Sequence, residues 1–394
     1  MKKFIMPLIF LFALLLPILC GNLLSDSSVS FFYAISLAIK ECLIFLLPFV
    51  IFSLLYTSFG RIGVGSLKLL MLIIPLICCS NFINTFLSYL LSSCCLKDGP
   101  ISVISVISQG KSVVVPLFSF SLPSVISNDL AMLSGAVAGI TFNLLKPNRL
   151  SMGISVIAEK FVKYFFGILI PFMPLFIFGT ALKLRHDGMI SLILSEYFTV
   201  MEFFLFSAYG YVLLQLFILS GFRFGRWIDY LKNLFPAVIT GFGSMSSAAA
   251  LPLSIKAAEA NLSNKDNAAI IVPSTVNIHL VGDCFFIPFV ALAILISFGK
   301  ELPDISTYFI FAIRFVAAKF AVAAVPGGGI LVMLPILQNY LGFSADMLGL
   351  ITTLYILFDS FITACNIAGN CSLAIFFDKI IETRKFFTEE KKET

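Results

Sequence analysis

The sequence predicts an all-α protein that crosses a lipid bilayer several times. Hydrophobic residues make up 59% of the 394 residues and charged residues 12%, whereas a soluble domain has roughly 45–50% apolar and about 25% charged residues. The hydrophobic residues lie in long runs, many of which reach the roughly 20 residues that a helix needs to cross a bilayer. A soluble protein of this composition would expose large apolar patches and aggregate. We therefore expect a polytopic membrane protein.

Hydrophobic segments follow one another along the whole chain. We interpret the first, after Lys2 and Lys3, as an uncleaved helix rather than a signal peptide, because Leu19 is too bulky for a cleavage site. Clusters of polar, glycine and proline residues separate the later segments. These segments are typical of membrane helices and run roughly from 31 to 59, 66 to 95, 125 to 145, 161 to 182, 197 to 220, 267 to 299, 306 to 340 and 347 to 377.

Lysine and arginine residues accumulate at both termini and in every second connection. Because such residues concentrate in cytoplasmic loops, both termini are expected in the cytoplasm. The net charge of +5 is scattered and indicates no nucleic-acid partner. The nine cysteines have no metal-ligand spacing, so no metal is expected beyond a transported ion. The connections rich in positive charge carry Arg61, Lys68, Lys146, Arg149, Arg223, Arg226 and Lys232.

Two stretches rich in glycine, proline and small residues interrupt the C-terminal half. Residues 241 to 252 are too short to cross the bilayer before Lys256 and Glu259. Residues 323 to 329 end in a proline and three glycines, which cannot continue a stable helix. Paired interruptions of this kind indicate an inverted-repeat transporter with a binding site near the midplane. Two kinked helices in close packing are the alternative.

Polar side chains gather in the segments that follow these interruptions. Asp359, Thr363, Asn366 and Asn370 are spaced by four, three and four residues, so on a helix they share one face. A carboxylate, a hydroxyl and two amides on one face suit a ligand with an ammonium group or a partly dehydrated cation, because polar groups at membrane depth are usually functional. The alternative is hydrogen bonding between helices.

A second polar group is formed by Asn277, His279 and Asp283. His279 and Asp283 are four residues apart and are expected to contact each other on one helix. The simple interpretation is a packed His–Asp pair. The functional interpretation is a titratable site whose protonation is coupled to transport.

The residues of these stretches resemble the dicarboxylate/amino acid:cation symporters, the glutamate-transporter family. Residues 234 to 262 are similar to the first re-entrant hairpin of that family, with a serine-rich tip followed by Leu251-Pro252. Residues 324 to 329 match its second hairpin tip nearly letter for letter, and residues 359 to 369 are similar to its last helix. The likeness is weaker upstream, at residues 47 to 54.

The resemblance implies eight transmembrane helices plus two re-entrant hairpins with inverted repeats, in an elevator-type homotrimer. Residues 1–65 and 96–196 would form the scaffold (helices 1–2 and 4–5), 66–95 (helix 3) and 197–378 the transport domain, and 379–394 a cytoplasmic tail. The Asp359 carboxylate would pair with the amino group of the substrate. Substrate contacts would come from Ser246, Ser247, Val325, Pro326, Gly327, Gly328, Gly329, Asp359, Thr363 and Asn366.

Several positions depart from the family pattern. The sodium-binding Asn-Met-Asp-Gly of the family lines up with residues 279 to 282, which lack its carboxylate, and a late sodium-binding Asp corresponds to Asn370. The Arg that holds a substrate's side-chain carboxylate corresponds to Ile362, our candidate for specificity. Since a carboxylate buried without a countercharge is strongly disfavoured, acidic substrates fit poorly. The candidates for cation coupling are Asn277, His279, Asp283, Asn366 and Asn370.

We therefore predict a symporter of the plasma (inner) membrane that imports an amino acid, a neutral one, with protons and/or sodium. It is expected to need no cofactor and not to be an enzyme. A dicarboxylate or glutamate symporter is the alternative within this class. A polytopic enzyme built around His279 and Asp283 is an alternative from another class, although no nucleophile, phosphate loop or metal set accompanies the pair. A non-transporting paralogue is the last alternative.

Overall fold

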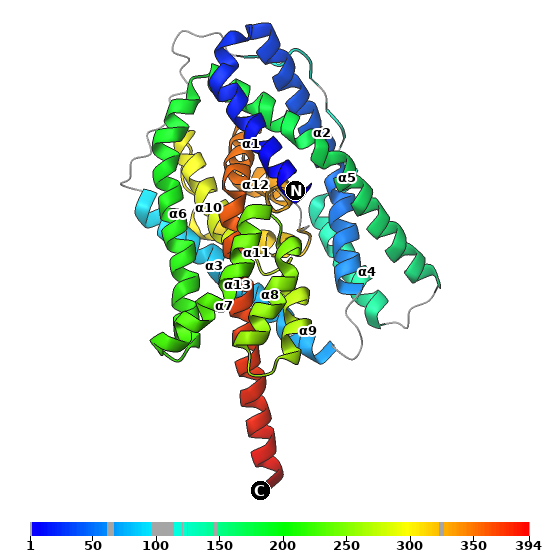
Figure 1. The fold of residues 1–394 in the computed structure, drawn as a ribbon. Helices are drawn as coiled ribbons and strands as arrows, with labels where there is room; N and C mark the ends of the chain where they lie inside the picture. Colours follow the sequence, from blue (N-terminus) through cyan, green and yellow to red (C-terminus); the bar gives the residue numbers. More distant parts are fainter. Residues whose placement is uncertain are drawn as a thin grey trace.

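A computed structural model of the protein describes residues 2–60, 67–96, 114–119, 121–123, 125–144, 149–322 and 327–393. All the secondary structure in these residues is helical (Figure 1). In chain order the helices are α1 (Lys2–Cys20), the short 3-10 helix η1 (Gly21–Leu23), α2 (Asp26–Gly60), α3 (Leu67–Leu96), α4 (Asn128–Leu144), α5 (Arg149–His186), α6 (Met189–Leu219), α7 (Phe224–Ser244), α8 (Ser247–Asn261), α9 (Asp266–Thr275), α10 (Val281–Ser297), α11 (Ile305–Lys319), α12 (Gly328–Leu341) and α13 (Ala345–Glu393).

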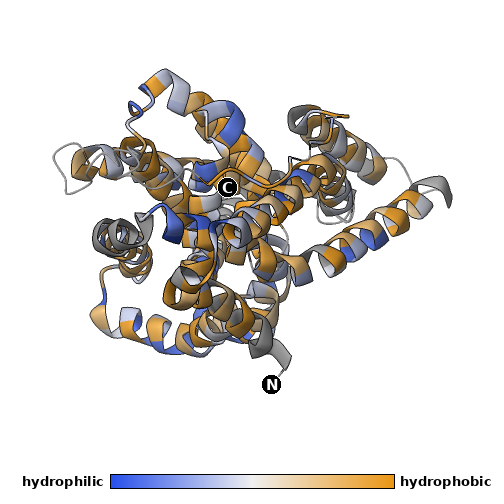
Figure 2. Cartoon of the chain, turned by 90° about the horizontal axis from the view of Figure 1, so that it is seen from above, coloured by the Kyte–Doolittle hydropathy of each residue, from blue (hydrophilic) through white to orange (hydrophobic). Residues whose placement is uncertain are grey.

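The helices present an apolar surface of the kind that lipid requires. Large hydrophobic side chains such as Phe12, Tyr164 and Phe206 are well exposed, and hydrophobic residues make up most of the helices in Figure 2. Such an exposed apolar surface is incompatible with water and is typical of a membrane protein. Four described helices contain segments long and apolar enough to cross a bilayer, namely Asp26–Thr57, Ile73–Leu96, Tyr197–Leu219 and Ala345–Ile381. The full count of eight spans and two hairpins stays a prediction.

The helices pack in two groups. In the first, α2 lies against α4 and α5, and α1 lies against α5. In the second, α13 runs through the middle of the molecule and contacts α6, α7, α8 and α10, while α3 packs on α10 and α11 (Figure 1). The division into a scaffold and a transport domain expected from the sequence stays a prediction. The expected tail continues α13 as far as Glu393.

The first interruption, at residues 241 to 252, is a tight helical hairpin. Helix α7 ends at Ser244, Met245 has a left-handed backbone (φ 50°), and α8 begins at Ser247. Ser246 caps α8, because its hydroxyl accepts a hydrogen bond from the N–H of Ala249 at 3.3 Å. The two arms pack against each other. The predicted turn at this serine-rich tip is therefore confirmed.

The second interruption separates α11, which ends at Lys319, from α12, which begins at Gly328. Helix α12 packs against α11, as α8 packs against α7. The predicted contact residues Val325 and Pro326 lie outside the described residues. Gly327 precedes α12 with φ 73°, a left-handed conformation that glycine adopts without strain.

One expectation about helix continuity is wrong. The hydrophobic segment from 267 to 299 is not a single helix, because α9 ends at Thr275 and α10 begins only at Val281. The break is stabilised from α3: the Asn81 amide donates to the carbonyl of Ile278 at 2.7 Å and accepts from the N–H of Leu280 at 3.4 Å. A side chain from a distant segment thus pairs backbone groups that would otherwise be unsatisfied in the membrane.

The loop between α8 and α9 gives a first prediction. The Asp378 carboxylate of α13 is buried and accepts from the N–H of Ser263 at 2.6 Å and the amide of Asn267 at 2.7 Å. Asp378→Ala should lower the free energy of unfolding by about 3 kcal/mol, because hydrogen bonds to charged groups contribute about 1.5–3 kcal/mol each. Thermal unfolding of the purified protein measures this. The nearby exposed Asp229→Ala is the control, and equal melting temperatures for the two variants would refute the tether.

Candidate functional site

A small polar cavity lies where the broken helices meet. Its volume is about 30 Å³, enough for a water molecule or two and too small for an amino acid. The cavity is bounded by both hairpins, by the break between α9 and α10, and by one face of α13. The lining residues are Met245, Ser247, Val276, Asn277, Leu280, Asp283, Val322, Gly329, Tyr355, Asp359, Thr363 and Asn366.

The polar face of α13 is confirmed and extends one turn further than expected. Asp359, Thr363 and Asn366 are buried and line the cavity together, as their spacing predicted. Tyr355 lies one turn earlier on the same face and also lines it. Asn370, one turn later, turns to α9 instead, where its amide donates to the carbonyl of Val272 at 3.4 Å.

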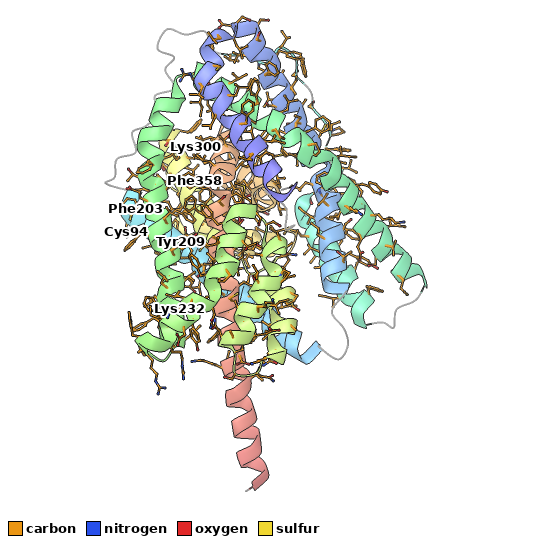
Figure 3. The ribbon with its side chains drawn as sticks, in the orientation of Figure 1. Cys94, Phe203, Tyr209, Lys232, Lys300 and Phe358 are labelled. Carbon is orange, nitrogen blue, oxygen red and sulfur yellow. The ribbon has the colours of Figure 1, made fainter. Side chains whose placement is uncertain are left out.

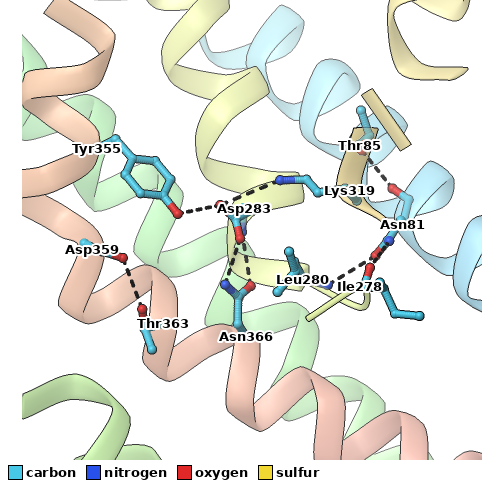
Figure 4. A network of polar contacts seen from close by, with 10 residues as sticks. All are labelled: Asn81, Thr85, Ile278, Leu280, Asp283, Lys319, Tyr355, Asp359, Thr363 and Asn366. Atoms are coloured by element: carbon cyan, nitrogen blue, oxygen red, sulfur yellow. Dashed lines mark hydrogen bonds and ion pairs between the residues drawn. The ribbon is translucent and has the colours of Figure 1, made fainter. Parts of the chain in front are cut away.

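Asp359 connects α13 to the second hairpin. One carboxylate oxygen accepts from the backbone N–H of Gly327 at 2.9 Å. The other accepts from the Thr363 hydroxyl at 3.1 Å, as Figure 4 shows. The side chain is 4% exposed. Because a carboxylate can accept about four hydrogen bonds, these two leave acceptor positions for a ligand in the cavity.

Asp283 is the centre of a second network. It accepts from the Tyr355 hydroxyl at 2.7 Å and from the Asn366 amide at 2.8 Å, while its own N–H donates to Asn366 at 3.3 Å (Figure 4). The ammonium of Lys319, at the end of α11, lies 3.6 Å from the same carboxylate. Asp283 therefore joins α10 to α13 and to the second hairpin.

The expected contact between His279 and Asp283 is wrong. His279 lies in the break before α10, so the two residues do not share a helix. The imidazole Nε2 shares a hydrogen bond of 2.9 Å with Ser80 of α3, and its Nδ1 has no hydrogen-bond partner in the described part of the chain. The prediction was wrong because a spacing of four residues brings two side chains together only on a continuous helix.

Some of the remaining predicted residues line the cavity and others do not. Ser247, Asn277 and Gly329 line the cavity. Ser246 is the N-cap of α8 and is not among the described lining residues. Gly327 supplies the N–H that Asp359 accepts, and Gly328 begins α12. Ile362 is fully buried in the apolar core and is not among the described residues that line the cavity.

The sequence interpretation missed Lys319, Asn81 and Tyr355. Lys319 could have been found, because a charge within the hydrophobic segment from 306 to 340 is itself a functional signal. Tyr355 could have been found by extending the polar face by four residues. Asn81 had no such signal, since an amide on a membrane helix is more often a contact between helices.

Two carboxylates and no lysine or arginine belong to the described lining of the cavity. Lys319 lies just behind Asp283, whereas Lys232 and Lys300 lie toward opposite ends of the helix bundle (Figure 3). The electrostatic character of the cavity is therefore acidic at Asp359, where no cationic side chain is in contact within the described residues.

Hydrophobic helices that are interrupted in pairs around a buried polar cavity are typical of secondary transporters. The chain belongs to the sodium:dicarboxylate symporter family, a sequence model of which matches residues 130–380. The protein is accordingly an integral membrane protein of a family of transporters rather than of enzymes.

Two curated relatives are similar to part of the chain. An uncharacterized symporter of Haemophilus influenzae is 28% identical over 159 residues, which cover 39% of this chain and 35% of that protein. The serine/threonine transporter SstT of Streptococcus thermophilus is 25% identical over 163 residues, which cover 39% of this chain and 40% of that protein. The alignments thus span well under half the length of these relatives.

Gly329 gives a second prediction. A Cβ at this position would overlap the Tyr355 hydroxyl and the Asp283 carboxylate, so Gly329→Ala should break the hydrogen bond between them. Overpacking of this kind costs about 1–3 kcal/mol, which thermal unfolding would record as a lower melting temperature. Gly210→Ala is the matched control, because a Cβ there meets nothing within 4 Å.

A second substitution separates this explanation from general damage. Tyr355→Phe removes the closest atom, so the double variant Gly329→Ala/Tyr355→Phe should recover part of the lost melting temperature. A Gly329→Ala protein as stable as the Gly210→Ala control would show that the close approach is unimportant.

Proposed function

We propose that the protein is a secondary active symporter that imports a neutral amino acid together with a cation. The observation that carries this proposal is the Asp359 carboxylate, which lines the cavity, is nearly fully buried and has acceptor capacity left over. A buried carboxylate is stable only when its charge is paired or hydrogen-bonded. The ammonium group of an amino acid is the partner that would complete its hydrogen bonding.

The carboxylate of an amino acid has suitable partners at the same cavity. Ser247 is the first residue of α8 and Gly329 the second residue of α12, so the N-termini of both helices adjoin the cavity. Helix N-termini favour negative charge through their free N–H groups and their dipole. Asp359 lines the same cavity and accepts from the N–H of Gly327, the residue before α12, so we take the N-terminus of α8 as the main site for the substrate carboxylate and expect the cavity to suit a zwitterion.

The side chain of the substrate is proposed to be uncharged. An acidic side chain would need a cationic partner, and the described lining of the cavity contains none. The name of the SstT relative, a serine/threonine transporter, supports small neutral substrates. The dicarboxylates in the name of the family are the second candidate, and the absence of a cation among these lining residues argues against them.

The coupling ion is proposed to be sodium rather than a proton. The proton hypothesis relied on contact between His279 and Asp283, which the structure does not contain. The side-chain oxygen of Asn370, in contrast, is buried and has no hydrogen-bond partner among the described residues. A neutral amide oxygen is a ligand for a hard cation but does not take up a proton near neutral pH.

Movement of one helix group against the other is proposed to carry the substrate across the membrane. In this structure Asp346, at the start of α13, accepts from the Tyr33 hydroxyl of α2 at 2.8 Å and lies 3.3 Å from the Lys183 ammonium of α5. These contacts join the two groups and would break as α13 moves. The homotrimer and the cytoplasmic position of both termini remain proposals from the family resemblance and the positive charges.

A binding experiment tests the role of Asp359. Asp359→Asn should weaken binding of labelled serine to the purified protein by about 30-fold or more, since breaking a buried charge pair costs about 2 kcal/mol or more. The exposed Asp229→Asn should bind as the unmodified protein does. N-Acetylserine, which lacks the ammonium group, should fail to compete with serine. Unchanged affinity of a folded Asp359→Asn protein would contradict the assignment.

A further inference from the structure

Lys319 is a fully buried lysine whose ammonium group lies between a carboxylate and an aromatic ring. Its side chain is 0% exposed, and its ammonium lies 3.6 Å from the Asp283 carboxylate and 4.4 Å from the centre of the Phe315 ring. It has no hydrogen-bond partner among the described residues. The ammonium is thus held by a carboxylate and the face of an aromatic ring, both of which attract a positive charge without requiring directed hydrogen bonds.

Asp283 depends on this positive charge. Its other two side-chain partners, Tyr355 and Asn366, are neutral donors, so within the described residues Lys319 is the cation that faces it. Removing one partner of a buried ion pair is strongly destabilising, because the other charge is left uncompensated. If the lysine were absent, the charge of Asp283 would have to be balanced by an ion from solution.

The pair also belongs to the transport site rather than to a remote part of the core. Asp283 lines the cavity together with both of its neutral partners, Tyr355 and Asn366. Lys319 is the last residue of α11, the first arm of the second hairpin. The ion pair therefore ties this hairpin to α10 at the cavity wall.

We propose that the Lys319 ammonium is a tethered cation that takes the place of one dissociable cation beside Asp283. This inference rests on the proposed cation-coupled transport and deepens it. Since the ammonium is covalently attached, it cannot leave with the substrate. Asp283 then moves through the cycle as one half of a neutral pair, and the cations that are released must be bound elsewhere, with Asn370 as a candidate ligand.

The thermal stability of purified variants in different salts tests this proposal. Melting temperatures are measured in sodium chloride and in N-methyl-D-glucamine chloride at equal ionic strength, so that general screening is the same in both. The proteins compared are the unmodified chain, Lys319→Met, the double variant Lys319→Met/Asp283→Asn, and Lys256→Met. Lys256 is exposed and provides the matched control for loss of a lysine.

Sodium should raise the melting temperature of Lys319→Met by about 5 °C more than it raises that of the unmodified protein, because the empty place beside Asp283 then binds a free ion. The double variant, which lacks the carboxylate as well, should lose this additional shift. Lys256→Met should respond to sodium as the unmodified protein does.

Three results would overturn the proposal. The first is a folded Lys319→Met protein whose sodium response equals that of the unmodified chain. The second is an additional sodium shift that persists in the double variant. The third is failure of Lys319→Met to fold in either salt, since this would show that sodium cannot replace the ammonium group beside Asp283. Because no substrate is used, a failure of the proposed transport function would appear separately, as absent uptake by the unmodified protein.

Discussion

Two buried carboxylates, Asp283 and Asp359, impose the constraint on which the rest of the polar cavity depends. An apolar helix bundle tolerates such groups only when each is paired or hydrogen-bonded. Asp359 obtains its donors from Gly327 and Thr363, and Asp283 obtains its donors from Tyr355 and Asn366 and a positive charge from Lys319. The second hairpin gives a backbone donor to Asp359 and a positive charge to Asp283, so these two contacts hold it against α13 and α10.

The broken helices follow from the same constraint. A continuous helix uses its own N–H groups, whereas a helix that begins at the cavity leaves its first N–H groups free for a ligand. The backbone freed by the breaks must be satisfied as well, and α3 supplies the side chain that pairs it between α9 and α10. Helix α3 is therefore a structural support of the site, although its Asn81 is not among the residues that line the cavity.

The sequence predicted those features that depend on short-range pattern. The hydrophobic segments, the interruption at residues 241 to 252 and the shared face of Asp359, Thr363 and Asn366 follow from composition, helix breakers and helical spacing, whereas the hairpin at that interruption was expected from the family resemblance. The break at 276–280 could not be predicted in this way, because a hydrophobic run shows no interruption when the compensating group is on a distant helix. The error about His279 and Asp283 came directly from that missed break. The pairing of Lys319 with Asp283 likewise needs the fold, since 36 residues separate them in the sequence.

Uptake into proteoliposomes under separately imposed gradients tests the central claim most directly. The purified protein would be reconstituted and given labelled serine or labelled aspartate, with either an inward sodium gradient at equal pH or an inward proton gradient without sodium. The account predicts that the sodium gradient drives accumulation of serine and that excess aspartate does not compete. Preferential accumulation of aspartate, or accumulation of serine driven by protons without sodium, would contradict it.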